Sequence, residues 1–124
     1  MKKILLVDDQ KTVLHVLNFA LASSRIEIVL EINGQEALRQ ARAQQFDLIL
    51  LDMHLPDISG LEVLRQLKLD ETTQEIPVIF LTGSNQLEDK VQALSLGAID
   101  YLSKPFTLDE IQHCVNRVLF ASRS

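Results

Sequence analysis

The chain has 124 residues, the length of one domain, and its 47% hydrophobic and 23% charged residues are ordinary for a soluble globular protein. Its net charge of −5 argues against nucleic acid as a direct ligand, because binding to a phosphate backbone requires a basic surface. The single cysteine, Cys114, excludes a disulfide bond within the chain and suits a reducing cytosol.

The first apolar run, Ile4 to Val7, is broken by Asp8 and Asp9, which is too early for a secretory signal peptide. No apolar stretch is long enough to span a membrane. We therefore expect a cytoplasmic protein without membrane association, in which residues 1–124 form one domain.

Five short apolar runs predict buried β-strands, and they alternate with five amphipathic patterns that predict helices. The expected strands are residues 4–7, 26–30, 48–51, 78–81 and 99–102. The second run alternates more than the others and is therefore expected near a sheet edge. The first helix is expected at about 11–23, and the others begin near Asn33, Ser59, Asn85 and Thr107. This alternation with short loops predicts an α/β fold with a doubly wound parallel sheet.

The last two helices carry apolar residues at helical spacing, which predicts their inward faces. For the fourth helix these residues are Leu87, Val91 and Leu94; for the fifth they are Leu108, Ile111, Val115 and Val118.

The stretch from Phe46 to Asp57 is central to the pattern. Its continuous apolar run, Leu48 to Leu51, is typical of a central parallel strand covered on both faces. Asp52 ends this run, and Pro56 follows four residues later. In open α/β sheets ligands bind beyond the carboxyl ends of the strands. Asp52 is therefore either a presented functional carboxylate or an acidic cap of the next loop.

Polar residues follow four of the five expected strands: Asp8 and Asp9, Asp52, Thr82, and Lys104. Parallel strands end at one rim, so these side chains are expected to converge. Three converging carboxylates repel one another unless a cation lies among them, and such oxygen ligands suit Mg²⁺. With a lysine and a hydroxyl beside them, the site would stabilise a phosphoryl group, and Asp52 would be the nucleophile that forms an acyl phosphate.

Each member of this set also has a purely structural interpretation. Paired aspartates and Thr82 can cap helices, and Lys-Pro is common in loops. Their joint placement at one rim favours the functional interpretation.

With these residues in these positions, the chain resembles the receiver domain of two-component response regulators and is similar to the single-domain chemotaxis regulator. The resemblance covers essentially the whole chain. The motifs that carry it are 7–9 (Val-Asp-Asp), 51–57 with Gly60 after it, 81–83 (Leu-Thr-Gly), and 97–106 (Gly-Ala-Ile-Asp-Tyr-Leu-Ser-Lys-Pro-Phe).

The resemblance implies a flavodoxin-like sheet of order 2-1-3-4-5. It implies phosphorylation of Asp52 by the phosphohistidine of a sensor histidine kinase or histidine phosphotransfer protein. Mg²⁺ would be held by Asp9, Asp52 and the backbone carbonyl of His54, with Asp8 acting through water.

The family also implies the remaining roles. Thr82 and Lys104 would contact the phosphoryl oxygens, and the Lys104–Pro105 bond would be cis. Tyr101, coupled to Thr82, would rotate inward on phosphorylation and change the surface of the fourth helix, fifth strand and fifth helix. A separate, unidentified effector protein would read that change.

Other positions say less or depart from the family. His54 and Ser84 occupy positions that are similar to those that tune phosphate lifetime. Receivers of winged-helix DNA-binding regulators resemble one another in the fifth helix, where an arginine follows four residues after a glutamate. Glu110 resembles that glutamate, but the residue four positions later in this chain is Cys114. We therefore expect a monomer or weak dimer.

We interpret the chain as a phosphoacceptor that catalyses only its own phosphorylation and dephosphorylation. Two alternatives stay open. The first is a magnesium-dependent phosphatase on a similar sheet. Such enzymes use a second aspartate, two residues after the nucleophile, to protonate the leaving group, and this chain has His54 at that position. The second is a protein-binding module that works without phosphate.

Overall fold

The computed structural model describes residues 1–83 and 86–120. Ser84 and Asn85, to which the sequence assigned a phosphate-bordering position and a helix start, lie outside this range. Five parallel strands form one sheet in the order β2-β1-β3-β4-β5, which confirms the predicted topology. The strands are β1 (Lys2–Val7), β2 (Ile26–Glu31), β3 (Leu48–Asp52), β4 (Val78–Thr82) and β5 (Asp100–Ser103). The helices are α1 (Lys11–Leu21), α2 (Gly34–Ala43), α3 (Gly60–Leu69), α4 (Leu87–Ser95) and α5 (Leu108–Phe120).

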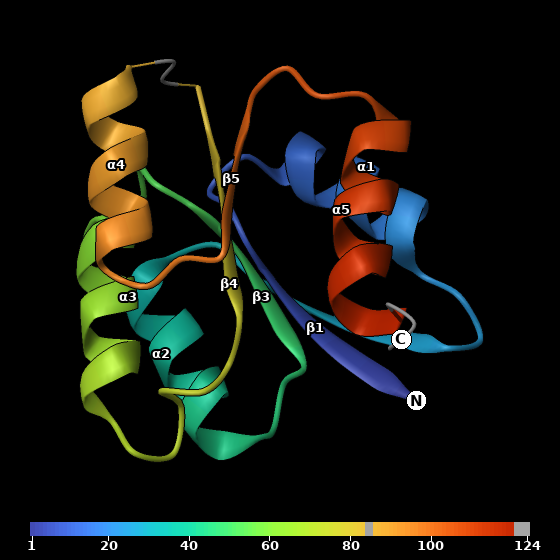
Figure 1. Cartoon of the computed structure of the whole chain (residues 1–124). Coiled ribbons are helices and arrows are strands. Elements are labelled where there is room, and N and C mark those ends of the chain that lie inside the picture. The colour runs from blue at the N-terminus through green and yellow to red at the C-terminus, as the bar shows by residue number, and fades with distance from the viewer. Residues whose placement is uncertain (84–85, 121–124) are drawn as a thin grey trace, which may run out of the picture.

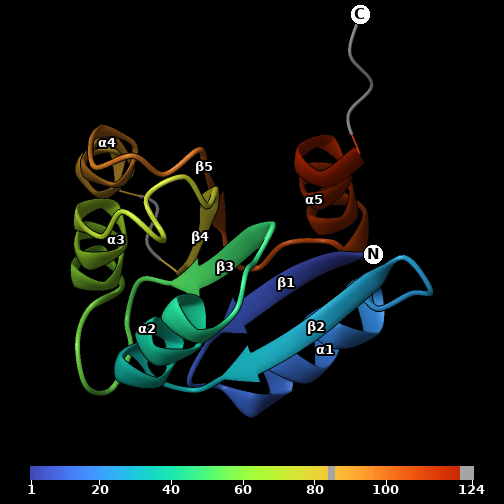
Figure 2. The same cartoon turned by 90° about the horizontal axis from the view of Figure 1, so that it is seen from below.

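The sheet lies between two helical layers (Figures 1 and 2). Helices α1 and α5 cover one face, and α2, α3 and α4 cover the other. Side chains alternate along each strand, so each face of the sheet contributes to a separate apolar core. Strands β3 and β4 are buried along their whole length, as their continuous apolar runs predict. β2, with its alternating pattern, is an edge strand as expected.

Local capping chemistry marks the starts of α3 and α5. The Ser59 hydroxyl accepts a hydrogen bond from the Glu62 backbone N–H (3.1 Å) at the start of α3. At the start of α5 the exchange is reciprocal: Thr107 Oγ1 accepts from the Glu110 N–H (3.0 Å), and Glu110 Oε1 accepts from the Thr107 N–H (2.8 Å). This is the capping box that the sequence predicts.

The predicted inward face of α4 is wrong. Leu87, Val91 and Leu94 are 72%, 53% and 42% exposed, and α4 packs on the sheet through the fully buried Ala93. The small side chain of Ala93 lets the helix backbone lie close to the core, so the larger residues of the helix face outward. Leu108 at the start of α5 is likewise exposed, whereas Ile111 and Val115 are buried as predicted and Val118 is partly buried.

In the part of the chain that the structure describes, no helix combines the length and the apolar character needed to cross a membrane.

Candidate functional site

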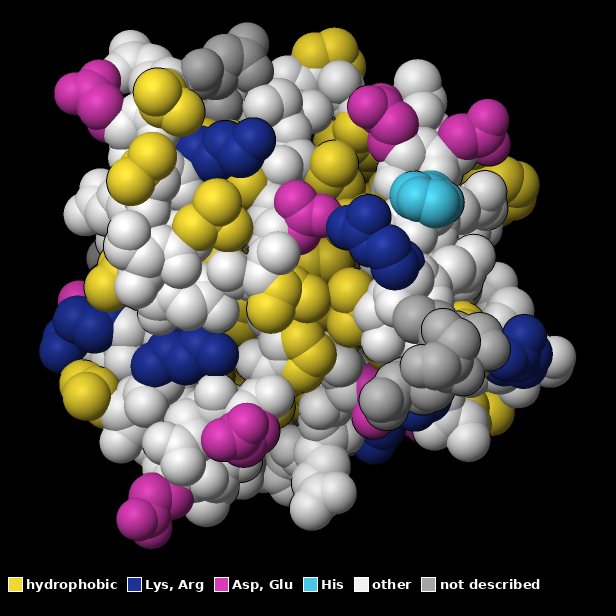
Figure 3. All heavy atoms as spheres, viewed as in Figure 1, with side chains coloured by type: hydrophobic (Ala, Val, Ile, Leu, Met, Phe, Trp, Pro, Cys, Tyr) yellow, Lys and Arg dark blue, Asp and Glu magenta, His cyan; other side chains and the backbone are white. Residues whose placement is uncertain are grey.

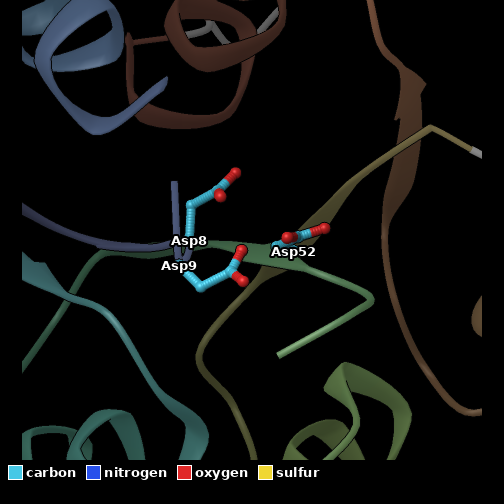
Figure 4. A group of neighbouring side chains, drawn as sticks. All are labelled: Asp8, Asp9 and Asp52. Atoms are coloured by element: carbon cyan, nitrogen blue, oxygen red, sulfur yellow. The ribbon is translucent and has the colours of Figure 1, made fainter. Parts of the chain in front are cut away.

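Three carboxylates meet at the carboxyl end of the sheet (Figure 4). Asp8 and Asp9 follow β1, and Asp52 is the last residue of the neighbouring strand β3. One carboxylate oxygen from each of the three lies within 4.8 Å of the others. Because β1 and β3 are hydrogen-bonded neighbours, their ends hold these side chains together. The convergence that the sequence predicts at this rim is present.

The three aspartates differ in burial, and this sets their electrostatics. Asp8 is fully buried and Asp52 is 5% exposed, whereas Asp9 is open to solvent. Burial raises the pKa of Asp52 to about 6, and the neighbouring negative charge of Asp8 adds to that rise. Lys104 and a hydrogen bond from the His54 backbone N–H act in the opposite direction. Ionised Asp52 is therefore under electrostatic stress in a site without a metal.

Lys104 supplies the positive charge of the site. Its Nζ lies 2.7 Å from Asp8 Oδ2 and 3.8 Å from Asp52 Oδ2. The Lys104 backbone N–H donates to the Thr82 carbonyl (2.6 Å), which ties the end of β5 to the end of β4. The Lys104–Pro105 peptide bond is cis. The amine thus partly neutralises two buried carboxylates that lie at the ends of the neighbouring strands β1 and β3.

A hydrogen bond joins the two ends of the loop between β3 and α3, which begins beside Asp52. The Gly60 N–H donates to the Met53 carbonyl (2.8 Å), which joins the two ends of the loop. Gly60 allows this because a Cβ at that position would overlap the Asp52 carbonyl oxygen and lie 2.8 Å from Met53 Cα. His54, exposed at the start of the loop, donates its N–H to Asp52 Oδ1 at 3.4 Å.

A second set of hydrogen bonds, which the sequence did not predict, joins this loop to α2. The Asp57 carboxylate accepts hydrogen bonds from the backbone N–H groups of Gly34 and Gln35, each 2.8 Å, at the start of α2. These partners are more than twenty residues away in sequence, and no local pattern at Asp57 points to them. A signal did exist: α2 begins with N–H groups that have no partner within the helix.

The acidic cluster opens into a pocket of about 330 Å³ lined by Asp9, Gln10, Asp52, His54, Gly83 and Lys104. A larger hollow of about 400 Å³, lined mainly by apolar groups of α1 and of residues 105–106, also touches Lys104. The larger hollow lacks the carboxylates, so the chemistry belongs to the smaller, acidic one.

Thr82 and Tyr101 lie on the neighbouring strands β4 and β5. Thr82 is fully buried at the end of β4. The Tyr101 side chain, on β5, is only 8% exposed and belongs to the core on the α2–α4 face. The expected inward rotation would start from an exposed ring, and in this structure the ring is already inside.

The donor set fits Mg²⁺. The cluster offers carboxylate oxygens within a few ångströms of one another, and Mg²⁺ prefers such hard ligands with room left for water. The raised pKa of Asp52 fits as well, because a divalent cation would relieve the repulsion that raises it.

Comparison with known families agrees with this geometry. The sequence model of one family, described as the response regulator receiver domain, matches residues 4–116. Among curated proteins, the alkaline phosphatase synthesis transcriptional regulatory protein PhoP of Bacillus subtilis is 38% identical over 118 residues, which are 95% of this chain and 48% of PhoP. The cell cycle response regulator CtrA of Brucella ovis is 34% identical over 98% of this chain and 51% of its own length. The chain thus spans about half the length of these relatives.

Solved structures are similar along nearly their full length. The chemotaxis protein CheY4 of Vibrio cholerae has a TM-score of 0.89 at 28% identity, covering 96% of this chain and 99% of that one. A receiver domain of a Pseudomonas aeruginosa sensor histidine kinase has a TM-score of 0.85 at 34% identity, covering 94% and 95%. That structure has a magnesium ion coordinated in its active site cleft.

Proposed function

The chain belongs to the response regulator receiver domain family, and from this premise we propose that residues 1–124 form one receiver domain that accepts a phosphoryl group on Asp52. The family acts in two-component signalling, where histidine kinases phosphorylate receivers. One observation carries the assignment. Asp52 combines burial, proximity to two further carboxylates and a lysine amine 3.8 Å away, at the open end of a central strand.

The proposed chemistry is phosphoryl transfer between a nitrogen and an oxygen. A carboxylate oxygen of Asp52 forms a bond to phosphorus as the bond between phosphorus and the donor's imidazole nitrogen breaks, and the imidazole leaves with the electron pair. Asp52 must be ionised to attack, and with a pKa of about 6 it is mostly ionised at neutral pH. The chain itself would assist only this transfer and the later hydrolysis of the acyl phosphate.

The neighbouring groups would hold the phosphoryl oxygens. Lys104 lies close enough to exchange its contact with Asp8 for one with a phosphoryl oxygen. Thr82, at the end of the next strand, would supply a hydroxyl. Both would act by stabilising negative charge.

Receiver domains bind Mg²⁺ at an acidic cluster, and Asp8, Asp9 and Asp52 form such a cluster here. We propose that Asp9, Asp52 and the His54 carbonyl would hold Mg²⁺ directly, with Asp8 acting through water. When bound, the ion supplies positive charge that offsets the charge on the carboxylates and the phosphoryl oxygens. The remaining protein groups would position the acceptor.

The test is labelling with acetyl phosphate and Mg²⁺. Wild type should gain one hydroxylamine-labile phosphate, and Asp52→Asn should gain none because an amide is a far poorer nucleophile. Millimolar Mg²⁺ should also stabilise wild type by about 1 kcal/mol or more in a thermal melt. Hydroxylamine-labile labelling of Asp52→Asn would show that Asp52 is not the acceptor, and steady turnover of a phosphate monoester would favour the phosphatase alternative.

We further propose a sensor histidine kinase or histidine phosphotransfer protein as the phosphodonor. The output would be a change in affinity for another protein at the face formed by α4, β5 and α5. That face carries exposed apolar side chains on α4, seen as yellow spheres beside a basic side chain in Figure 3. Direct DNA binding is not expected of a chain with a net charge of −5.

A tight dimer of the DNA-regulator type is not expected either. Asp100 Oδ2 is engaged within the chain by Arg117 (3.0 Å) and by the Cys114 thiol (3.3 Å). Asp100 and Arg117 thus already pair with each other within the chain. Size-exclusion chromatography of the beryllofluoride-activated chain should give a monomer or a weak dimer, and a tight dimer with retention on DNA would contradict this.

Thr82 and Tyr101 would form the switch. Because the Tyr101 ring is already buried, phosphorylation would stabilise this inward position rather than create it. Tyr101 is the sole tyrosine in a chain without tryptophan, so quenching of its fluorescence by acrylamide reports on this ring. Beryllofluoride should leave quenching equal or lower; stronger quenching would contradict the proposed direction.

A further inference from the structure

We propose that Asp57 is a positioning residue for the metal side of the site: its carboxylate fastens the β3–α3 loop to the first turn of α2 and so fixes the His54 carbonyl. The inference rests on the proposed function, because it assumes that this carbonyl faces Mg²⁺.

The contact joins two segments that are distant in sequence. Both carboxylate oxygens of Asp57 are used, Oδ1 by the Gly34 N–H and Oδ2 by the Gln35 N–H, at 2.8 Å each. The first N–H groups of a helix have no partner within it, and the N-terminal end of the helix dipole favours an anion. Burial raises the pKa of Asp57, but these hydrogen bonds outweigh it and the pKa is lowered. The carboxylate is thus a charged cap supplied by a different loop.

Packing beside these hydrogen bonds shows how closely the two segments meet. A Cβ at Gly34 would lie 2.5 Å from Ile58 Cγ1 and 2.9 Å from Val63 Cγ2. Gly34 is the first residue of α2, and Ile58 is the neighbour of Asp57 in the loop. The absence of a side chain at Gly34 therefore lets the start of α2 pack directly against the Ile58 and Val63 side chains.

The same support is linked to the other carboxylates. The Glu31 carbonyl, at the end of β2, accepts a hydrogen bond from the Asp8 N–H (3.1 Å). The chain then passes within three residues into α2, where Asp57 is bound. The β3–α3 loop is held at its ends by the Gly60 N–H bond to the Met53 carbonyl. Besides the direct pairing of β1 with β3, Asp57 therefore provides a second link between the loop that carries His54 and the strand end that leads to Asp8.

A matched pair of variants separates positioning from simple helix capping. Asn33 also caps α2, because its Oδ1 accepts from the Glu36 N–H (2.8 Å), but it does not link α2 to the β3–α3 loop through that bond. Asp57→Ala and Asn33→Ala should both lower the melting temperature. Only Asp57→Ala should weaken Mg²⁺ binding, with a dissociation constant roughly threefold to tenfold higher than that of wild type. Loss of a group that orients a metal ligand usually lowers metal affinity by about tenfold or more, so this effect lies at or below the low end of that range. The Mg²⁺ affinity of Asn33→Ala should stay within about twofold of that of wild type, because the effect of this substitution is confined to the helix.

Two readouts are used on the full chain, Mg²⁺ titration by calorimetry and amide hydrogen exchange without metal. In Asp57→Ala, exchange should accelerate at residues 54–58, and Asp57→Asn, which keeps one acceptor oxygen, should fall between it and wild type. The asparagine variant gives the same comparison if the alanine variant does not fold. Equal Mg²⁺ affinity in Asp57→Ala and wild type, or equal losses in the Asp57 and Asn33 variants, would overturn the inference alone. A wild-type chain that binds no Mg²⁺ would overturn the proposed function, and this inference with it.

Discussion

Replacing Asp52 by asparagine should stabilise the metal-free protein while removing its proposed chemistry. The substitution keeps the size of the side chain and an acceptor oxygen for the His54 N–H, but it removes a negative charge that is 5% exposed and close to Asp8. Functional carboxylates held together against repulsion are a local source of instability. Removing one therefore tests whether the site is strained as its geometry implies.

The magnitude follows from the raised pKa. Asp52 titrates near pH 6 in the fold and near 3.8 when unperturbed. Each unit of difference corresponds to about 1.36 kcal/mol, so ionised Asp52 destabilises the fold by about 3 kcal/mol at most. The folded state binds the proton more tightly, so this penalty is complete above about pH 6 and disappears below about pH 3.8. By this linkage it falls to about half at pH 5.

Chemical denaturation in EDTA at pH 7.5 and pH 5 measures this effect. Asp52→Asn should be more stable than wild type by up to about 3 kcal/mol at pH 7.5, and by about half as much at pH 5. Mg²⁺ should narrow the gap, because it stabilises wild type more. Asp70→Asn is the control: hydrogen bonds from Thr72 lower the pKa of Asp70, so its neutralisation should not stabilise the fold. An Asp52→Asn variant no more stable than wild type at pH 7.5 would refute the reasoning.

Three further predictions follow from neighbouring contacts. Lys104→Ala removes the amine 2.7 Å from Asp8, so the stability of the metal-free protein should fall and the pKa of Asp52 should rise. Mg²⁺ should still bind and restore the stability. A thermal melt measures the stability, and an NMR titration measures the pKa. Gly60→Ala should destabilise the fold by about 1–3 kcal/mol, because the new Cβ would overlap backbone atoms. Gly83→Ala is the control: its Cβ would meet open space, so stability should change by less than about 0.5 kcal/mol. Equal effects of the two substitutions in chemical denaturation would contradict this. Val91→Asp on the exposed side of α4 should change stability by less than about 0.5 kcal/mol, yet weaken capture of a phosphorylation-dependent partner in a pull-down; normal capture would argue against that face.

The fold and the rim of the site could be predicted because both depend on local patterns. Apolar runs that end in polar residues identify the strands and their carboxyl ends, and parallel strands bring those ends to one edge. These two rules suffice to predict that Asp8, Asp9 and Asp52 lie together, as they do in the structure. The edge position of β2 followed from its alternating pattern in the same way.

The inward face of α4 could not be predicted, because periodicity shows that a helix has an apolar face but not where that face points. The stripe from Leu87 to Leu94 is genuine, but it faces outward, and Ala93 makes the contact with the core. Alanine carries little hydrophobic signal in a sequence, although it permits the closest packing. An apolar stripe left at the surface suits a protein that binds partners.

Long-range polar contacts were also beyond local patterns. Lys104 could be placed at the rim, but not its choice of Asp8 over Asp52, because that depends on side-chain positions on three strands. The bonds from Asp57 to α2 span more than twenty residues and depend on how closely a glycine lets two segments meet.

The different exposures of the three aspartates suggest how the site can be both strained and accessible. Asp8 is buried and is paired with the Lys104 amine, so its charge is already balanced. Asp52 is nearly as buried but lies 3.8 Å from that amine, which leaves it the less compensated of the two. Asp9 is open to solvent and lines the pocket. A cation arriving from solvent would therefore meet the exposed Asp9 first and relieve the buried charge of Asp52, the proposed phosphoacceptor, which is less compensated than that of Asp8.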